Sequence, residues 1–433
     1  MVFNLKSSNL NYKFLSGSVA IVRYLFMTYL DLRQYKKTRS TTTLPKHLAE
    51  ISEIRVDPEE YKKNRAYNLD KQSFHLFKTT FSLFISLGLL YMNYMAGLWE
   101  LFFFGTDSLF WALVLYLLVE SIRSILIQTP FQYYANFGIE EKHGFNKMTL
   151  RTFITDTGKS FVIGYIMEII LCGIMVYLME KLQEKFIIYA WVLIMAFSLF
   201  FLVIYPSVIA PWFNKFEPLG AGSEKEKVLR EKLEILCKEL GFPLGEVFKM
   251  DGSKRSDHSQ AYFFGVLGKK KIVVYDTLLE KLEIEEIVAV VGHELGHWKH
   301  KHNVQMITTA FLKIGFILYL FTFFLNNDKM YFDHGLGQKH YFMGFNLFMM
   351  IYSPLEILTG AAMCWLSRKN EYQADRFAVS LGKGKELASG LIKIFKDNKA
   401  NMDPDELYSL FHHTHPNLAE RLAAIKFEVS KRA

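Results

Sequence analysis

The chain has 433 residues, of which 51% are hydrophobic and 16% aromatic, and its mean hydropathy is +0.12. This composition favours a membrane protein over a set of soluble domains. The formal net charge of +8 comes without an arginine/aromatic binding module, so nucleic acid is not an expected partner. Three widely spaced cysteines support neither a disulfide framework nor a cysteine metal site.

Seven apolar segments approach the length of about 20 residues that crosses roughly 30 Å of hydrocarbon. They lie at about 14–30, 79–97, 108–128, 161–178, 187–209, 304–326 and 341–366. The first segment has no small-residue cleavage site and is followed by a long basic loop. We interpret it as a retained anchor and not as a signal peptide.

The basic residues of the connecting loops predict the orientation. The loop 31–78 carries eleven Lys and Arg, whereas 98–107 carries none and 327–340 carries two. The 210–303 segment and the tail after residue 366 are rich in them. The positive-inside rule therefore predicts a lumenal amino terminus, with the long segment and the tail in the cytosol.

Ionisable residues also occur within the predicted spans, namely Glu120, Arg123, Glu168, Lys313 and Glu356. Each costs about 2.5–3.5 kcal/mol at the bilayer centre when it faces lipid. We therefore expect them to face protein or water, with Glu120 and Arg123 pairing across one helical turn. The hypothesis is a polar cavity enclosed by the spans. For Lys313 and Glu120 the alternative is a position near the interface from which the side chain snorkels.

The segment "HELGH" at 293–297 has the spacing of a zinc protease. The preceding "KLEIEEIVAVV" has helical periodicity, and on a helix His293 and His297 project from one face. Glu294 is rotated by about 100° and can reach a metal-bound water as a general base. A metzincin would place its third ligand nearby, but this chain has His300 and Asn303 at the diagnostic positions, which excludes that class.

The third ligand is predicted from topology. The spans at 304–326 and 341–366 form a hairpin, so the chain returns to the face that it left at "SRKNEYQAD", residues 367–375. Glu371 completes a His₂Glu set that leaves a position open for water, as in catalytic zinc sites. Asp375, one helical turn on, is placed to orient a ligand imidazole. The alternative is that both acids form a solvated helix face.

The predicted fold is mainly α-helical and polytopic, with seven transmembrane helices enclosing a polar chamber and a zinc metalloprotease domain with a small β element in the cytosol. We divide the chain into a membrane region with five spans, a catalytic segment, a transmembrane hairpin and a carboxyl-terminal catalytic segment. Their bounds are 1–209, 210–303, 304–366 and 367–433.

The chain resembles the CAAX prenyl protease 1 family, integral-membrane zinc metalloproteases that process prenylated proteins ending in Cys-a-a-X. The resemblance rests on "HELGHWKHKH" at 293–302, "SRKNEYQADRFA" at 367–378, "GSKRSDHSQAYFFG" at 252–265, "IVVYDTLLE" at 272–280, "HHTHPNLAERL" at 412–422 and "YKKNRAYNLDKQSF" at 61–74. It implies seven helices around a water-filled chamber, one zinc ion held by His293, His297 and Glu371, and Glu294 as the base.

The resemblance also assigns His415 to contacting the scissile peptide and its developing oxyanion. Without the resemblance, the sequence does not distinguish His415 from His412 or His413 for this role. One departure concerns the family pattern S-x-S-N-A-Y, where this chain has Gln260 in place of asparagine. Glutamine keeps the amide but adds a methylene, so it would bond the substrate from a shifted position.

Two apolar runs, "AYFFG" and "KIVVYD", indicate short strands. An edge strand with Ala261 and Tyr262 could hold an extended peptide beside Gln260 by main-chain pairing. The alternative is a small structural hairpin. Arg421 and the lysines of "GKKKIVV" at 268–274 are candidates for binding a terminal carboxylate, although the lysines are better explained as solvated loop charges.

The expected activity is a zinc endopeptidase that removes the aaX tripeptide from farnesylated CaaX proteins, with a second upstream cut left open. The expected partners are prenylated CaaX-terminated proteins and the lipid bilayer. The resemblance implies the endoplasmic reticulum membrane, with the inner nuclear membrane as an alternative. Three alternative hypotheses for the function are a prenyl-independent quality-control protease, a transporter and a catalytically inactive scaffold. No internal repeat supports a transporter.

Overall fold

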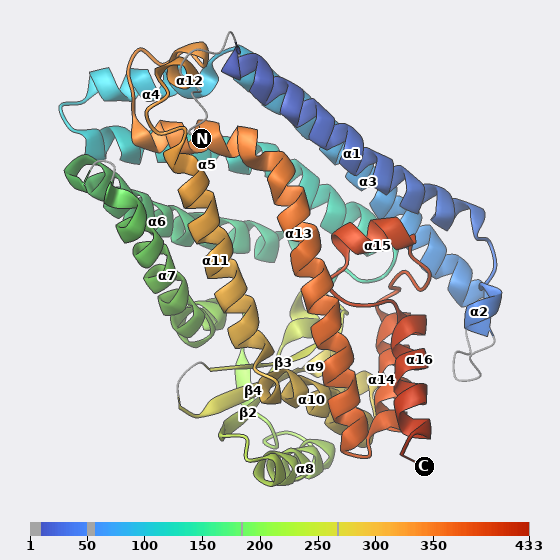
Figure 1. Cartoon of the computed structure of the whole chain (residues 1–433). Helices are drawn as coiled ribbons and strands as arrows, with labels where there is room; N and C mark the ends of the chain where they lie inside the picture. Colours follow the sequence, from blue (N-terminus) through green and yellow to red (C-terminus); the bar gives the residue numbers. More distant parts are fainter. Residues whose placement is uncertain (1–9, 50–56, 183–184, 266–267, 433) are drawn as a thin grey trace.

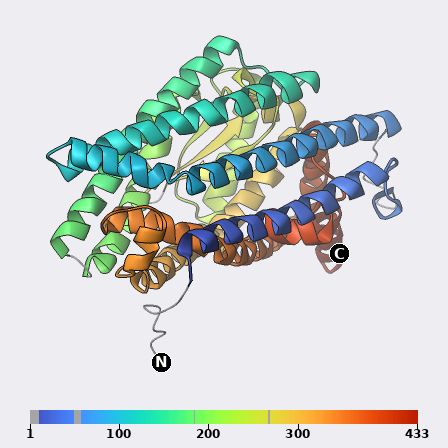
Figure 2. The ribbon, with the colours of Figure 1, turned by 90° about the horizontal axis from the view of Figure 1, so that it is seen from above.

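The computed structural model describes residues 10–432 apart from 50–56, 183–184 and 266–267. Long helices make up one part of the molecule, and a small sheet with shorter helices gathers at one end of them (Figure 1). The helices α1 and α3 run side by side along one edge (Figures 1 and 2). The chain therefore separates a helical region from a mixed region that carries the sheet.

The helical region contains seven long helices within the residues described. These are α1 (Tyr12–Ser40), α3 (Pro58–Tyr91), α5 (Leu109–Tyr133), α6 (Leu150–Leu182), α7 (Phe186–Ile204), α11 (His302–Thr322) and α13 (Tyr341–Ser380). Shorter elements connect or extend them, namely α2 (Lys46–Ala49), α4 (Tyr94–Gly105), η2 (Tyr134–Glu140), η4 (Tyr205–Ile209), η5 (Ala210–Trp212) and α12 (Asp328–Asp333).

Among the described residues, six helical stretches are long and apolar enough to cross a membrane. They are Pro58–Tyr91, Leu109–Glu140, Leu150–Leu182, Phe186–Trp212, His302–Thr322 and Tyr341–Ser380. They match six of the seven predicted spans. The second predicted span, 79–97, extends beyond its helix. Helix α3 ends at Tyr91, Asn93 has a φ of 55°, and α4 begins after it.

The predicted count of seven spans is not confirmed. Helix α1 covers the first predicted span, but it is not among the six stretches. Arg23 and several serine, glycine and tyrosine residues lower its hydropathy. Helix α1 still exposes large apolar side chains such as Val22 and Leu25, at 63% and 59%, so its place in the bilayer stays a prediction.

Four of the five charged residues within the spans line cavities. Glu120 and Arg123 pair at 2.5 Å, as predicted, and together with Glu168 they line a cavity of about 750 Å³. Glu356 lines a second cavity of about 710 Å³. These four residues therefore lie at cavities between helices, whereas a single polar chamber enclosed by the spans stays a prediction, as does the position of Lys313 relative to the interface.

The mixed region has six helices and four strands in the part of the chain that the structure describes. The helices are α8 (Glu224–Leu240), α9 (Asp276–Lys281), α10 (Ile284–Lys299), α14 (Gly384–Asp397), α15 (Glu406–His412) and α16 (Leu418–Ser430), and a short turn η6 spans Gly252–Lys254. The strands are β1 (Phe216–Pro218), β2 (Leu244–Met250), β3 (Ala261–Phe264) and β4 (Lys270–Tyr275). Their order in the sheet is β1-β2-β4-β3.

Strands β3 and β4 are the two short strands predicted from the apolar runs, and they pair antiparallel. Strand β2 pairs with β4 in parallel and with β1 antiparallel. Strand β3 therefore lies at one edge of the described sheet, next to α10.

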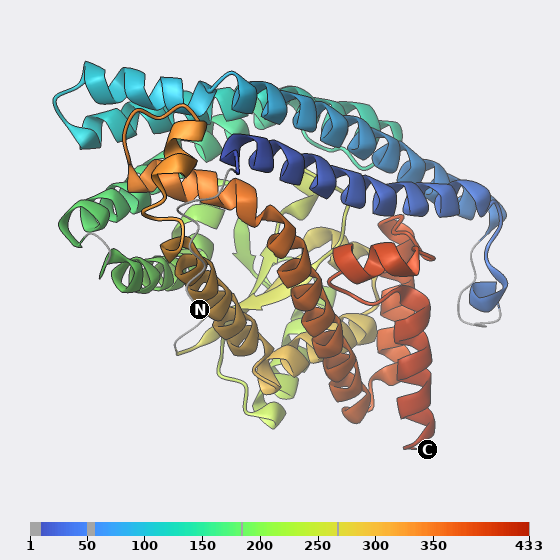
Figure 3. The same ribbon diagram turned by 45° about the horizontal axis from the view of Figure 1, so that its top comes forward.

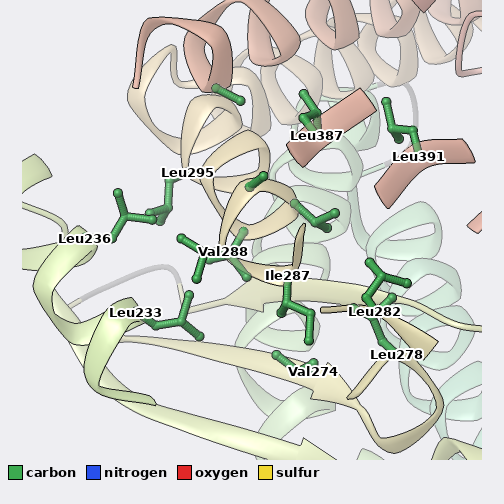
Figure 4. Packing of buried hydrophobic residues seen from close by; sticks show 14 of the residues in the cluster. Leu233, Leu236, Val274, Leu278, Leu282, Ile287, Val288, Leu295, Leu387 and Leu391 are labelled. Atoms are coloured by element: carbon green, nitrogen blue, oxygen red, sulfur yellow. The ribbon is translucent and has the colours of Figure 1, made fainter. Parts of the chain in front are cut away.

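One apolar core joins the sheet, α8, α10, α14 and α16. Figure 4 labels ten of its members, Leu233, Leu236, Val274, Leu278, Leu282, Ile287, Val288, Leu295, Leu387 and Leu391. The segments before and after the α11–α13 hairpin thus pack on each other. The boundaries proposed for the four regions of the chain stay a prediction.

The far end of α13 belongs to this mixed region. Helices α14, α15 and α16 gather around it (Figure 3), and α10 packs against it at Gly296. A Cβ atom at Gly296 would lie 3.0 Å from the Cα atom of Ala374. Glycine therefore permits the close approach of the two helices that carry the predicted metal ligands.

Candidate metal centre

Helix α10 presents one polar stripe to α13. Its amino terminus is fixed by a reciprocal pair of hydrogen bonds between Glu283 and Glu286. Val288, Val291 and Leu295 are buried in the apolar core. Because these side chains fix the rotation of the helix, the histidines four residues apart turn together toward α13.

Three side chains converge on one point. The Nε2 atoms of His293 and His297 lie 3.2 Å apart, and they lie 3.5 and 3.3 Å from the two carboxylate oxygens of Glu371. His293 and Glu371 are 6% and 3% exposed. The predicted ligand set is thus assembled, from residues 78 positions apart.

The chemistry of these donors fits a metal ion. One atom from each of the three residues lies within 4.8 Å of the other two. The Glu371 carboxylate is buried, and its Oε2 atom faces the nitrogen atoms of His293 and His415 over 3.5 and 2.9 Å. Two imidazole nitrogens and one carboxylate match the ligand preferences of zinc. The site can therefore hold a divalent cation and leave a coordination position free.

The other nitrogen of His293 is bound by Asp375, as the sequence predicted. Its Nδ1 atom lies 2.8 Å from Asp375 Oδ1. The guanidinium group of Arg421 donates to both oxygens of Asp375, over 2.7 and 2.9 Å. Because Nδ1 donates its proton to Asp375, Nε2 keeps the lone pair that a metal requires.

Glu294 follows the first histidine on α10 and is not part of the convergent triad. Burial raises the pKa of its carboxyl group. A glutamate with a raised pKa is better matched to accepting and returning a proton near neutral pH. This environment suits the predicted role of general base.

The structure distinguishes the three candidate histidines of the "HHTH" segment. His415 Nδ1 lies 2.9 Å from Glu371 Oε2, and the His415 side chain is 61% exposed. His413 shares a hydrogen bond with the Ser409 hydroxyl, and burial lowers its pKa to about 4. His412 stacks on Tyr408. Of the three, His415 is the one that reaches the metal ligands.

Three of the four residues predicted to bind substrate lie around the edge strand. Ala261 and Tyr262 are in β3, opposite Val274 and Val273 of β4. Gln260 directly precedes the strand, its side chain is exposed, and its carbonyl oxygen accepts from the Tyr275 amide over 3.1 Å. Their binding roles stay a prediction, supported by the place of β3 beside α10.

The cationic candidates lie in different surroundings. Arg421 is 5% exposed and occupied by Asp375. Lys270 donates to the Gly265 carbonyl, and the Lys271 ammonium lies 5.0 Å from the ring centre of Phe248. Both lysines are half-buried residues of β4, so the interpretation as solvated loop charges is wrong for them.

Three residues near the centre were not singled out from the sequence. His302 Nδ1 lies 3.0 Å from Nδ1 of His297, and His302 Nε2 lies 2.8 Å from Oε1 of Gln373. Arg368 donates to the carbonyl oxygens of Ser409 and His413. All three lie inside the quoted motifs, but no spacing rule gives their partners.

Two family models match most of the chain. The model described as CAAX prenyl protease N-terminal, five membrane helices, matches residues 34–215. The model of peptidase family M48 matches residues 223–429, which contain every residue of the convergent site.

Curated relatives are similar over nearly the whole chain. A CAAX prenyl protease 1 homolog of Arabidopsis thaliana is 36% identical, covering 95% of this chain and 96% of the relative. One from Homo sapiens is 34% identical and covers 93% of each. The CAAX prenyl protease 1 of Saccharomyces cerevisiae is 33% identical and covers 100% of each.

A solved structure has the same fold. The crystal structure of S. mikatae Ste24p superposes with a TM-score of 0.88 at 33% sequence identity, covering 97% of this chain and all of that one.

Proposed function

The chain belongs to the CAAX prenyl protease 1 family of M48 metallopeptidases, and we propose that it is a zinc endopeptidase that removes the aaX tripeptide from farnesylated CaaX proteins. It is a multi-pass membrane protein. The observation that most directly supports this function is that His293, His297 and Glu371 converge on one point beside Glu294. A second, upstream cut of the same substrates remains part of the proposal.

The ligand set belongs to this proposal as one zinc ion per chain. His293, His297 and Glu371 would hold the ion, and Asp375 fixes the orientation of the first imidazole. When bound, zinc polarises the scissile carbonyl and promotes ionisation of a water molecule. The buried carboxylate of Glu371 balances part of the charge of the cation.

Glu294 moves the proton. Its carboxylate accepts a proton from the water that attacks the carbonyl carbon of the peptide between the prenylated cysteine and the first aliphatic residue. The carbon–nitrogen bond then breaks, and Glu294 returns the proton to the departing amine. The products are a protein ending in the prenylated cysteine and a free tripeptide.

His415 and β3 position the substrate. The exposed imidazole of His415 reaches the ligand Glu371 and can donate a hydrogen bond to the oxygen that gains negative charge. The edge of β3 can add an extended peptide as a further strand. In this arrangement Gln260, Ala261 and Tyr262 line the path of the peptide backbone.

The location of the centre suits lipid-modified substrates. Helix α11, a candidate span, begins at His302, five residues after the ligand His297. A farnesyl group gains roughly 0.8 kcal/mol for each CH₂-like unit buried in the bilayer. The membrane therefore concentrates such substrates at the level of the metal centre. We place the protein in the endoplasmic reticulum membrane, with the inner nuclear membrane as an alternative.

The charge pattern of the loops supports the proposed orientation. The lumenal amino terminus and the cytosolic site follow from the excess of lysine and arginine in 31–78 over 98–107. An acceptor sequon for glycosylation placed near the amino terminus should be modified in microsomes, whereas one in the tail should stay unmodified.

The decisive experiment compares two matched peptides, one farnesylated at its Cys-a-a-X end and one unmodified, with purified wild type and Glu294→Gln. We expect metal-dependent release of the last three residues from the farnesylated peptide by the wild type alone. Equal cleavage of both peptides would favour the alternative, a prenyl-independent protease of membrane-protein quality control. Equal activity of Glu294→Gln would refute the assignment of the base.

A further inference from the structure

The two histidine ligands differ in what holds their outer nitrogens. His293 donates to the carboxylate of Asp375, whereas Nδ1 of His297 meets a second imidazole, that of His302, over 3.0 Å. His302 is 3% exposed. Its other nitrogen, Nε2, lies 2.8 Å from the amide oxygen of Gln373.

If Nε2 of His297 binds the metal, the positions of the protons on His297 and His302 are fixed. Nε2 of His297 needs a free lone pair to bind a metal, so its ring proton must be on Nδ1. That proton is donated to Nδ1 of His302, which must then carry its own proton on Nε2. This second proton needs an acceptor, and the side-chain oxygen of Gln373 lies in that position.

Hydrogen bonds donated in the opposite direction, from Gln373 toward His297, are incompatible with metal binding at Nε2 of His297. If Gln373 donated its amide N–H to His302, His302 would in turn donate to Nδ1 of His297. The remaining proton of His297 would then be on Nε2, pointing toward the Glu371 carboxylate oxygen 3.3 Å away. Only one direction of hydrogen bonding leaves the lone pair free.

We propose that His302 and Gln373 are positioning residues that hold His297 in its metal-binding tautomer and orientation, with Gln373 as the terminal acceptor. The proposal rests on the metal-centred function proposed above. In this proposal both residues act through His297 and contact neither the substrate nor the reacting atoms.

The fold explains how the three groups meet. Lys301 has a φ of 57° between α10 and α11, and this left-handed residue turns the chain so that His302 comes back beside His297. Gln373 follows Glu371 by two residues on α13. The helix that supplies the third ligand thus also supplies the acceptor that orients the second ligand.

A series at Gln373 tests the role of the terminal acceptor. Gln373→Met removes the acceptor at similar volume, whereas Gln373→Glu retains an oxygen in its place. The measurement is the affinity of the metal-free protein for Zn²⁺ in competition with a chromophoric chelator, together with the visible spectrum of the Co²⁺-loaded protein. We expect a roughly 10- to 100-fold loss of affinity for the Met variant, as is typical when such outer partners are removed, and recovery in the Glu variant.

A double variant of His302 and Gln373 tests whether the two residues act through one chain of hydrogen bonds or only through packing. His302→Phe should lose at least as much affinity as Gln373→Met, and the combination of both should lose no more than His302→Phe alone. His300→Gln is the matched control, because His300 is exposed and stacks on the His302 ring without a hydrogen bond to His297 among those described. It should bind Zn²⁺ as the wild type does.

Thermal unfolding of each metal-free variant checks that it folds, and the Gln373 series decides the matter if His302→Phe does not fold. Wild-type affinity in Gln373→Met, or a Glu variant as weak as the Met variant, would overturn the proposal. Because the readout is metal affinity, a wild-type protein that binds Zn²⁺ but does not cleave the farnesylated peptide would refute the proposed substrate and leave this test intact.

Discussion

Asp375 Oδ1 lies 2.8 Å from Nδ1 of His293, on the side of the imidazole away from the proposed ligand atom. The same carboxylate is 1% exposed and binds Arg421. One buried acid thus contacts both a proposed metal ligand and a buried guanidinium group, so we expect metal affinity and stability to depend on it together.

Asp375→Asn should therefore weaken both properties. The amide keeps the shape but removes the negative charge closest to the buried Arg421, which leaves that cation only Glu371 Oε2, 3.5 Å away; breaking such a buried pair costs about 3–5 kcal/mol of unfolding free energy. Loss of the carboxylate next to His293 should also lower Zn²⁺ affinity about 10- to 100-fold. Chemical denaturation of the metal-free protein and chelator competition measure the two effects separately, and an unchanged unfolding free energy would contradict the ion-pair argument.

Gly296→Ala should separate α10 from α13. The new methyl group would lie 3.0 Å from the Cα atom of Ala374 and 3.1 Å from Cβ of Phe377, so the helices must shift and Glu371 must move away from the histidines. We expect loss of bound zinc and of peptidase activity. Gly360→Ala is the control, because nothing in the described structure lies within 4 Å of its added Cβ. A fully metallated Gly296→Ala enzyme would refute the close-contact explanation.

Arg368→Met should impair catalysis while metal binding persists. Its guanidinium group donates to the carbonyl oxygens of Ser409 and His413 and so holds the segment that carries His415. We expect kcat to fall by up to about 10²- to 10³-fold, the cost of losing an oxyanion donor, with bound zinc unchanged. Lys369→Met, which alters the neighbouring cation over the Trp365 ring, should leave kcat near that of the wild type.

Metal uptake should release a proton from His293. Burial lowers the pKa of this imidazole, but its hydrogen bonds to Asp375 and Glu371 outweigh burial and raise the pKa to about 9 in the metal-free protein. Below that pH a proton occupies the ring and must leave before the ring binds metal, so apparent affinity should rise about tenfold per pH unit up to about pH 9. Calorimetric titration in buffers of different ionisation enthalpy counts the released protons. Release that vanishes at pH 7 would contradict the raised pKa.

Local periodicity accounts for what the sequence predicted about the site. A spacing of four residues places His293 and His297 on one face of any α-helix, and the helix is present as α10. Glu371 could be added because a membrane hairpin must return the chain to the side that it left. Both arguments use chain geometry and need no knowledge of side-chain packing.

The span count shows where composition is insufficient. Helix α1 has the predicted position, but Arg23 lies in its middle and lowers its hydropathy, and its partner Glu356, 3.3 Å away, comes from α13. Whether such a charge is compensated depends on a residue more than three hundred positions away. Hydropathy read along one segment does not contain that information.

The sequence by itself determined the membrane character and the family motifs and predicted the metal ligands and the base, because these depend on helical period, hydrophobic length and local residue type. The tertiary structure decided which outer groups serve the ligands. His302 reaches His297 through a left-handed turn at Lys301, Gln373 reaches His302 across 71 residues, and Arg421 reaches Asp375 across 46. Such pairings are set by how α10, α11, α13 and α16 pack, and a contact between side chains on different helices leaves no periodic trace in the chain.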